Sequence, residues 1–188
     1  MFVVKVFLAS KQKGKELSRE IIVMVKKDQR MRKGSVWNAL VDKRNTKRLK
    51  EIIKRYGWPT LSLVGREAAD GAWLLAQHAD LDVRFQKKVL GLMTQAVAHG
   101  EARKKHLAYL TDRILVNISK PQLYGTQFFT DKQGILGPRP IKNPQHLAAR
   151  RKAFGLEPFS LYIKRVRRVS RFFGKPKEAQ RFFRKVRK

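Results

Sequence analysis

Hydrophobic residues recur at helical spacing along much of the chain. Leu17, Ile21 and Val25 lie four positions apart within 16–32, and Gly34 interrupts the pattern, so we predict a first helix there. Similar spacing predicts three consecutive helices within 67–118 as the heart of the fold. Small residues on one side of the helix over 67–79 permit another helix to pack closely against it. Helices are predicted from a cap at Asn45 or Thr46 to Gly57, over 67–79, from Asp82 to Gly100, and over 103–118.

Two further segments have an extended pattern. Thr60 to Val64 follows the rigid Trp58-Pro59 pair and is predicted as a short extended piece. Met1 to Ser10 is an apolar burst interrupted by Lys5, which we interpret as a short strand or a mobile arm. The burst is far shorter than the roughly 20 apolar residues that a membrane span needs. Lysines follow it rather than precede it, so it does not have the pattern of a secretory signal.

The hydrophobic period changes after Pro121. Residues 122–129 and 135–141 flank turn-forming residues from Asp131 to Gly134, so we predict one β-hairpin within 122–141. Asn143-Pro144 predicts a helix that reaches Phe154, since asparagine caps helices and proline suits the first helical position. Two more helices are predicted, one from Pro158 through Phe173 and a last one from Pro176.

These elements predict a mainly α fold, a compact helical domain with one small β-hairpin and basic helical extensions. We expect a basic N-terminal arm over 1–15, the helical domain over 16–168, and a basic amphipathic C-terminal helix over 169–188.

Charge changes the picture at both ends of the chain. The 188 residues include 44 Lys and Arg against 14 Asp and Glu, a net charge of +30. Residues 1–56 hold 17 basic and 5 acidic residues, and residues 161–188 hold 12 and 1, so the ends carry most of the excess. An apolar share of 43% argues against disorder throughout. Because an anion would relieve the self-repulsion of two basic ends, we expect a polyanionic partner.

RNA or a ribonucleoprotein such as the ribosome is the expected partner, bound through phosphates with weak sequence specificity. Arginine suits this role because it takes phosphate bidentately and stacks on exposed bases. Two alternatives stay open: attachment of the C-terminal helix to an anionic membrane surface, and a generally basic proteome without a specific partner. The candidate nucleic-acid-binding residues are Lys43, Arg44, Lys47, Arg48, Arg55, Arg165, Arg167, Arg168, Arg171, Arg181, Arg184 and Arg187.

Several chemistries lack the residues they need. The chain has no cysteine, which excludes disulfides, thiolate zinc sites, iron–sulfur clusters and a cysteine nucleophile. It also lacks a phosphate-binding glycine loop, a G-x-S-x-G elbow and an H-E-x-x-H helix, and we predict no metal and no cofactor. A reducing compartment is permitted, so we expect a cytoplasmic location, with the mitochondrial matrix as an open alternative.

Ordered motifs run through the middle of the chain. They are GWPT (57–60), AWLLAQHAD (72–80), AYLTDR (108–113), QLYGTQ (122–127), PRPI (138–141) and GLEP (155–158), with Asp28-Gln29 and Asn45-Thr46 ahead of them. Over about 17–163 the chain resembles an uncharacterised bacterial domain family, from which it departs in its very basic first fifty residues and tail. The resemblance implies a shared domain and carries no catalytic role.

An enzyme of unknown reaction is the alternative function, with candidate catalytic residues in the same motifs. His78 can transfer a proton near neutral pH, and Asp112 or Asp80 can fix its tautomer if they lie within hydrogen-bond reach. Arg113 can hold an anion and Gln127 offers amide donors and acceptors, so one cleft for a small-molecule ligand is conceivable. The competing interpretation is structural, with Asp112 and Arg113 as an ion pair. The residue pattern favours that structural interpretation and leaves the oligomeric state open.

Overall fold

The computed structural model describes the backbone of residues 2–33 and 38–173, and the side chains of 12–33 and 38–169. Its described part is mainly helical with one small antiparallel hairpin, which confirms the predicted fold class. The elements are α1 (Phe2–Lys33), α2 (Ala39–Tyr56), α3 (Leu61–Gln77), α4 (Val83–Ala98), α5 (Lys104–Asn117), β1 (Phe128–Thr130), β2 (Leu136–Pro138), η1 (Pro144–His146), α6 (Leu147–Ala153) and α7 (Phe159–Phe173).

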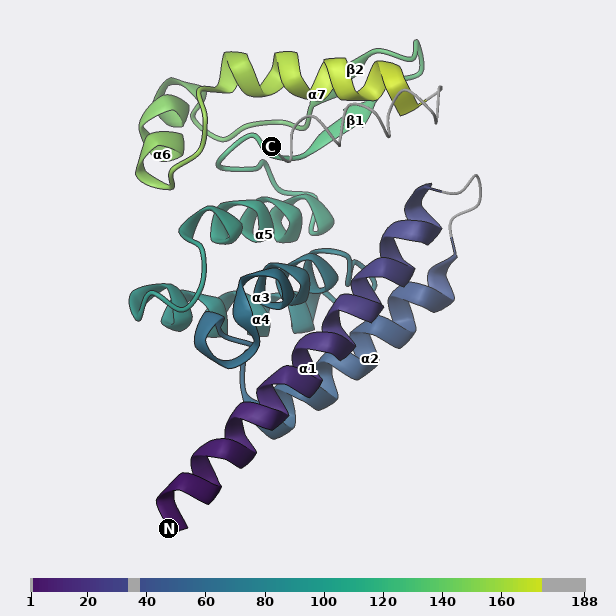
Figure 1. Cartoon of the computed structure of the whole chain (residues 1–188). Helices are drawn as coiled ribbons and strands as arrows, with labels where there is room; N and C mark the ends of the chain where they lie inside the picture. Colours follow the sequence, from purple (N-terminus) through teal and green to yellow (C-terminus); the bar gives the residue numbers. More distant parts are fainter. Residues whose placement is uncertain (1, 34–37, 174–188) are drawn as a thin grey trace.

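The helices form two tiers. The long α1 and α2 run antiparallel to each other and pack against α3, whereas the hairpin, α6 and α7 lie on the far side of α5 (Figure 1). Buried apolar residues from α1 to α5 form one continuous hydrophobic core. The core therefore extends beyond the three consecutive helices expected to form the heart of the fold, because α1 and α2 each contribute a buried stripe.

The closest packing in this core joins α1 to α3. Ala69, Ala72 and Ala76 are buried, which confirms that the small residues of α3 face a neighbour. A Cβ at Gly71 would lie 2.9 Å from a methyl of Val25, and one at Gly14 would lie 2.3 Å from a backbone oxygen of α3. Both glycines therefore allow an approach that no other residue permits without a shift.

The interpretation of Met1–Ser10 as a short strand or arm is wrong for the described residues, because α1 begins at Phe2 and continues to Lys33. The boundary expected at residue 15 thus falls inside one helix. No proline interrupts 2–33, and Gly14 is retained in the helix where α1 passes close to the backbone of Leu63. A short apolar run fits a strand or a helix equally well, and its continuation decided the outcome.

Two other helix starts differ from the prediction. The helix expected to begin at Asn45 or Thr46 begins at Ala39, where the Asn38 side chain accepts a hydrogen bond from the Leu40 N–H at 2.9 Å. Asn45 instead lies buried within α2. The segment 60–64 is not extended, because Thr60 caps α3 by accepting from the Leu63 N–H. Gly65, with φ 78°, departs from helical dihedral angles inside α3. A glycine at this position makes the segment before it look non-helical in the sequence.

The remaining local predictions hold in most respects. Asp82 caps α4 by accepting from the Phe85 N–H, and the hairpin turns at Asp131 and Gly134 as expected. Asn143 precedes η1 and α6 but makes no side-chain cap, because its backbone is left-handed with φ 45°. The expected boundary at 169 falls inside α7, which ends at Phe173, and the helix predicted from Pro176 lies outside the described residues.

Candidate functional site

A buried carboxylate from α1 meets a histidine at the end of α3. Asp28 is fully buried, and both of its carboxylate oxygens lie 3.0 Å from Nδ1 of His78, the residue that ends α3. Arg32, one turn after Asp28, approaches the same carboxylate at 3.2 Å through Nε and donates to Asp42 of α2 at 2.7 Å. Three helices thus meet at one ionic cluster, which we call the Asp28 cluster: Asp28, Arg32, Asp42 and His78.

The proton on His78 can be placed from these contacts. Nε of Arg32 lies 3.0 Å from Nδ1 of His78, but both atoms cannot donate to each other. An arginine Nε always carries hydrogen, and an ionised carboxylate accepts only, so both N–H groups point to Asp28. His78 therefore donates through Nδ1, and Nε2 is its remaining hydrogen-bonding atom.

The charge state of Asp28 follows from its neighbours. Burial alone would raise the pKa of Asp28, but the hydrogen bond and charge of His78, with Gln29 and Arg32, outweigh it and hold that pKa below its ordinary value. Asp28 is thus an ionised group inside the protein. Such a group orients the imidazole ring of His78, as carboxylate partners do for catalytic and metal-binding histidines.

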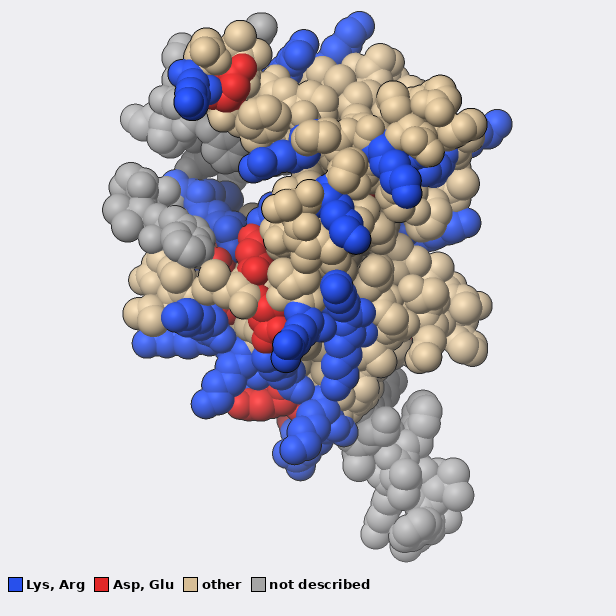
Figure 2. Space-filling model, turned by 180° about the vertical axis from the view of Figure 1, so that it is seen from behind, with Lys and Arg blue, Asp and Glu red and all other residues tan. Residues whose placement is uncertain are grey.

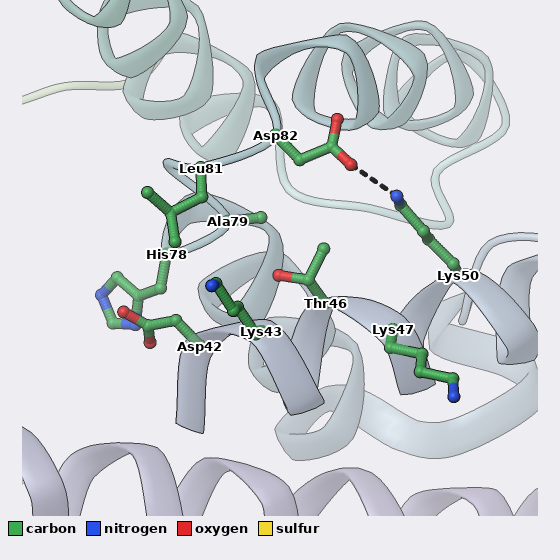
Figure 3. Close-up of a pocket in the computed structure, with 9 residues that line it drawn as sticks. All are labelled: Asp42, Lys43, Thr46, Lys47, Lys50, His78, Ala79, Leu81 and Asp82. Atoms are coloured by element: carbon green, nitrogen blue, oxygen red, sulfur yellow. Dashed lines mark hydrogen bonds and ion pairs between the residues drawn. The ribbon is translucent and has the colours of Figure 1, made fainter. Parts of the chain in front are cut away.

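His78 also lines a pocket between α2 and the turn that joins α3 to α4. The pocket has a volume of about 290 Å³. In Figure 3, Lys43 and Thr46 point toward the space beside His78, Lys47 turns away from it, and Lys50 reaches Asp82 across the pocket. The side chains that matter most to its chemistry are Lys43, Thr46, Lys47, Lys50, His78 and Asp82.

The acidic groups of this pocket are matched by cations. Asp82 pairs with Lys50, and Asp42 accepts from Arg32. Lys43 and Lys47 are exposed and form no ion pair within the described residues. The lining therefore keeps an excess of positive charge that no described carboxylate compensates.

The enzyme hypothesis places four residues in one cleft, but the structure brings together only Arg113, Gln127 and Asp112, whereas His78 is held by Asp28. Arg113 binds Asp80 through two nitrogens and donates to Gln127 at 3.1 Å, and Asn117 donates to Asp80 at 2.8 Å. Burial would raise the pKa of Asp80, but the hydrogen bonds and charge of Arg113 dominate and lower it. This group joins the α3–α4 turn to α5 and the hairpin, and Arg113 pairs with Asp80 rather than with Asp112.

Asp112 is occupied by backbone groups. Its buried carboxylate accepts N–H hydrogen bonds from Leu123, Tyr124 and Thr126 at 2.7 to 3.2 Å, and a further one from the Thr126 hydroxyl. Burial dominates over these donors and raises the pKa of Asp112. The expected role of Asp112 or Asp80 in orienting His78 is thus taken by Asp28, which sequence spacing could not show.

The candidate nucleic-acid-binding residues in the described part of the chain lie on α2 and α7. Lys43, Arg44 and Lys47 are exposed, whereas Arg48 pairs with Glu20 and Glu51. Figure 2 shows Lys and Arg gathered over the lower part of one face, along the α1–α2 pair, with a few acidic side chains among them. Arg55 lies over the ring of Tyr56, and Arg165 of α7 pairs with Glu157. Arg167 and Arg168 are exposed on α7. The side chains of the remaining candidates lie outside the described part: Arg171, Arg181, Arg184 and Arg187.

Sequence reasoning missed Asp28, Arg32 and Asp42 as partners of His78. Asp28 lies 50 positions before His78, so no local spacing connects them. The available signal was the placement of Asp28 among apolar residues on the inner side of a helix, where an unpaired carboxylate would be costly. Within the described side chains, no group of three or more His, Asp or Glu residues is arranged to hold a metal ion.

No helix in the described ranges 2–33 and 38–173 is long and apolar enough to cross a bilayer.

Comparison with known proteins places the chain in one family. No curated protein and no solved structure matches the chain. One family model, described as a family of unknown function, matches residues 15–171, a range that contains the Asp28 cluster, the pocket and the hairpin. In agreement with the resemblance found in its motifs, the chain belongs to this family, DUF6624.

Proposed function

We propose that the protein binds RNA, free or in a ribonucleoprotein, through phosphate contacts along the exposed side of α2. The observation that carries the proposal is the group Lys43, Arg44 and Lys47, which we call the α2 basic face. These residues are one and four positions apart, so they lie on neighbouring parts of one helix surface. All three are exposed, and none forms an ion pair within the described residues.

The fold does not need these charges. The inner side of α2 holds Asp42, Asn45, Leu49, Ile52 and Ile53, and it supplies the packing that keeps the helix in place. The outer cations repel one another, which costs free energy that a bound polyanion recovers. From Lys43 to Lys54 the helix covers about 16 Å, a length that corresponds to roughly five nucleotides of one strand.

The structure narrows the set of residues suited to this role. Arg48 and Arg165 already hold carboxylates, so a phosphate would have to compete for them. Arg55 remains suitable because a guanidinium on an aromatic ring keeps its outer N–H groups available. We infer a cytoplasmic location from the same proposal, since RNA is the partner and the chain has no cysteine.

The two alternative functions have weaker support. His78 is held by Asp28, whereas Arg113 and Gln127 bond to each other and Asp112 is occupied by backbone N–H groups. The enzyme alternative therefore loses the arrangement on which it rests. Membrane attachment was assigned to the C-terminal helix, most of which lies outside the described residues.

Filter binding to a single-stranded RNA at several salt concentrations tests the proposal. We expect affinity to fall steeply with salt, by about 0.7 logarithmic units per neutralised phosphate and tenfold rise in salt. The K43Q/R44Q/K47Q variant should weaken binding and make the slope shallower by about 2, because it removes three phosphate contacts.

A matched control removes the same charge elsewhere. R84Q/K87Q/K88Q takes three exposed cations from α4 at similar helical spacing. It should leave the slope close to that of the wild type. Binding that does not depend on salt, or an equal loss in the α4 variant, would contradict a specific role for the α2 basic face.

A further inference from the structure

We propose that the outer face of the hairpin stacks an unpaired nucleobase of single-stranded RNA on the ring of Phe129. The proposal rests on the proposed function and adds a base-directed contact to the phosphate contacts of α2. Phe129 lies in β1 and is 38% exposed, whereas every other Phe, Tyr and Trp side chain within 12–33 and 38–169 is buried or half-buried. The face of an aromatic ring is a group on which bases of any identity stack.

The pairing of the two strands places Phe129 away from the body of the protein. Phe129 pairs with Gly137, and its neighbour Phe128 pairs with Pro138. Because successive side chains of a strand point to opposite faces, Phe128 and Phe129 lie on different sides of the hairpin. The ring of Phe128 contacts Tyr162 of α7, with centroids 5.6 Å apart, and α7 runs along the hairpin in Figure 1. The side that carries Phe129 is thus the one that α7 leaves uncovered.

The residue opposite Phe129 leaves an open space beside the ring. A Cβ at Gly137 would have no atom within 4 Å apart from those of its chain neighbours. Gly137 is not among the glycines with positive φ, so the backbone does not require a glycine here. Side chains that oppose each other across an antiparallel pair normally contact each other, and a glycine within a strand often marks the place where a ligand comes close. Gly137 therefore leaves room for a flat ligand next to Phe129.

Arg139 supplies a cation beside the same ring. Its guanidinium carbon lies 5.0 Å from the centroid of the Phe129 ring. Arg139 is exposed, and it contacts this ring rather than a carboxylate. A guanidinium that rests on an aromatic ring restricts the ring and keeps N–H groups for a phosphate oxygen. A base on Phe129 and the phosphate of its own nucleotide on Arg139 can thus be held together.

The charges near the hairpin favour a nucleic acid as the occupant of this face. Lys132 and Lys142 are exposed, as Arg139 is. The one acidic residue within 128–142 is Asp131, and its carboxylate already accepts two backbone N–H groups of the turn, at 3.0 and 2.7 Å. An aromatic ring among cations is the combination that binds single strands, since the cations pair with the phosphates and the ring stacks on a base.

Fluorescence anisotropy with two labelled RNA probes tests the proposal. One probe is a short oligoadenylate, and the other has the same length, label and phosphates but abasic riboses. We expect the wild type to bind the oligoadenylate at least fivefold more tightly, because stacking of one base contributes roughly five- to a hundredfold. Equal affinity for the two strands would overturn the stacking site and leave the phosphate contacts of α2 in place. Binding of neither strand would overturn both proposals.

Variants of Phe129 test whether the base stacks on this ring. F129L should lose the preference for the oligoadenylate, because leucine is apolar but has no flat face, whereas F129W should retain it. L161A is the matched control, since Leu161 is an apolar side chain of α7 that is 52% exposed. It should change the affinity for neither strand. A preference of wild-type size in F129L would overturn the proposal.

A substitution at Gly137 guards against a folding defect in F129L. G137V fills the open space with a residue that favours strands, so the preference for the oligoadenylate should disappear while the melting temperature does not fall. A preference retained in G137V would contradict the site.

The two proposals respond to different variants. The K43Q/R44Q/K47Q variant should weaken the binding of both strands by a similar factor and keep the preference for the oligoadenylate. The abasic strand reports the phosphate contacts of the α2 basic face independently of the hairpin, so failure of either proposal can be distinguished from failure of the other.

Discussion

His106 shows how strongly one residue can depend on its surroundings. Its ring stacks on Trp73 with centroids 3.8 Å apart and an interplanar angle of 6°. Burial, with the charges of Lys105 and Arg103, lowers the pKa of His106 to about 3. A carboxylate oxygen of Asp70 lies 3.6 Å from Nδ1 of His106, beyond hydrogen-bond distance. Burial raises the pKa of Asp70. The pair is therefore not a salt bridge at neutral pH.

We expect this histidine to make the protein acid-sensitive below pH 6.5. The unfolded chain binds a proton on His106 below its ordinary pKa of 6.5, whereas the folded protein does so only near 3. The contribution to stability is thus present above pH 6.5 and is lost as the pH falls, by roughly 3 kcal/mol at pH 4. Urea unfolding between pH 7.5 and pH 4 should show a shallower decline for H106F than for the wild type. An unchanged decline in H106F, or an equal change in H99F, would contradict this assignment.

Residues differ in how far the sequence reveals their roles. Asp82 was predicted as a cap because its partner, the Phe85 N–H, lies three positions away. Asp28 was missed as a functional residue because its partner lies 50 positions away and is brought close only by the packing of α1 on α3. His78 could be predicted as a candidate residue, but its hydrogen-bond partner, the Asp28 carboxylate, could not. Local hydrogen bonds follow chain spacing, and long-range ones follow packing.

At the scale of elements, Asp112 attaches the hairpin region to α5. Four donors from the loop 123–126 converge on this buried carboxylate. Two carbonyls of this loop in turn bind helices of the second tier. The Tyr124 carbonyl accepts a hydrogen bond from Arg151 of α6 at 2.5 Å, and the Thr126 carbonyl accepts one from Tyr162 of α7. Asp112 and this loop thus connect the second tier to α5, in addition to the hydrogen bond from Arg113 to Gln127.

We expect D112N to lower the free energy of unfolding by about 1 to 3 kcal/mol, because the amide NH₂ opposes a backbone N–H that then has no acceptor. Asp131 provides a matched control, since it also accepts two backbone N–H groups but lies in the exposed hairpin turn. D131N should cost less than about 1 kcal/mol. Equal losses in the two variants, measured by urea unfolding, would show that burial does not set the cost.

Element boundaries depended on similar distinctions. The hairpin turn and the end of α5 were predicted because turn residues and breakers act locally. The starts of α2 and α3 were not, because Asn38 and Thr60 had competitors nearby in sequence, Asn45 and the Trp58-Pro59 pair. In α3 the earlier start lets Leu61 and Leu63 pack against the core, and in α2 the added turn carries Asp42, which pairs with Arg32 of α1. The local sequence contains neither of these long-range contacts.

For the whole molecule, the net charge of +30 sets the response to solution conditions. The described ion pairs use some of the acidic residues, for example Glu20 and Glu51 on Arg48, but they leave a large excess of cations. Repulsion among these cations opposes the compact state, and salt screens it over about 10 Å at 0.1 M.

We therefore expect the melting temperature to rise as NaCl increases from about 0.02 M to 0.3 M, because shorter screening lengths weaken this repulsion. The K43Q/R44Q/K47Q variant should respond less, since it has lost three of the repelling charges. Differential scanning fluorimetry across the salt series measures both. A melting temperature that falls with salt would mean that attractive pairs outweigh the repulsion.

The closure of the hairpin region at its base has a practical consequence. Gln122 bonds to Pro140 and Lys142 through its backbone, and its fully buried side chain donates to the carbonyls of Gln127 and Arg139. The tip at 132–135, by contrast, is exposed. Because the base is fastened independently of the tip, an epitope tag or a fluorophore-bearing peptide inserted after Gln133 leaves the scaffold intact, which provides an attachment point for imaging the protein in cells.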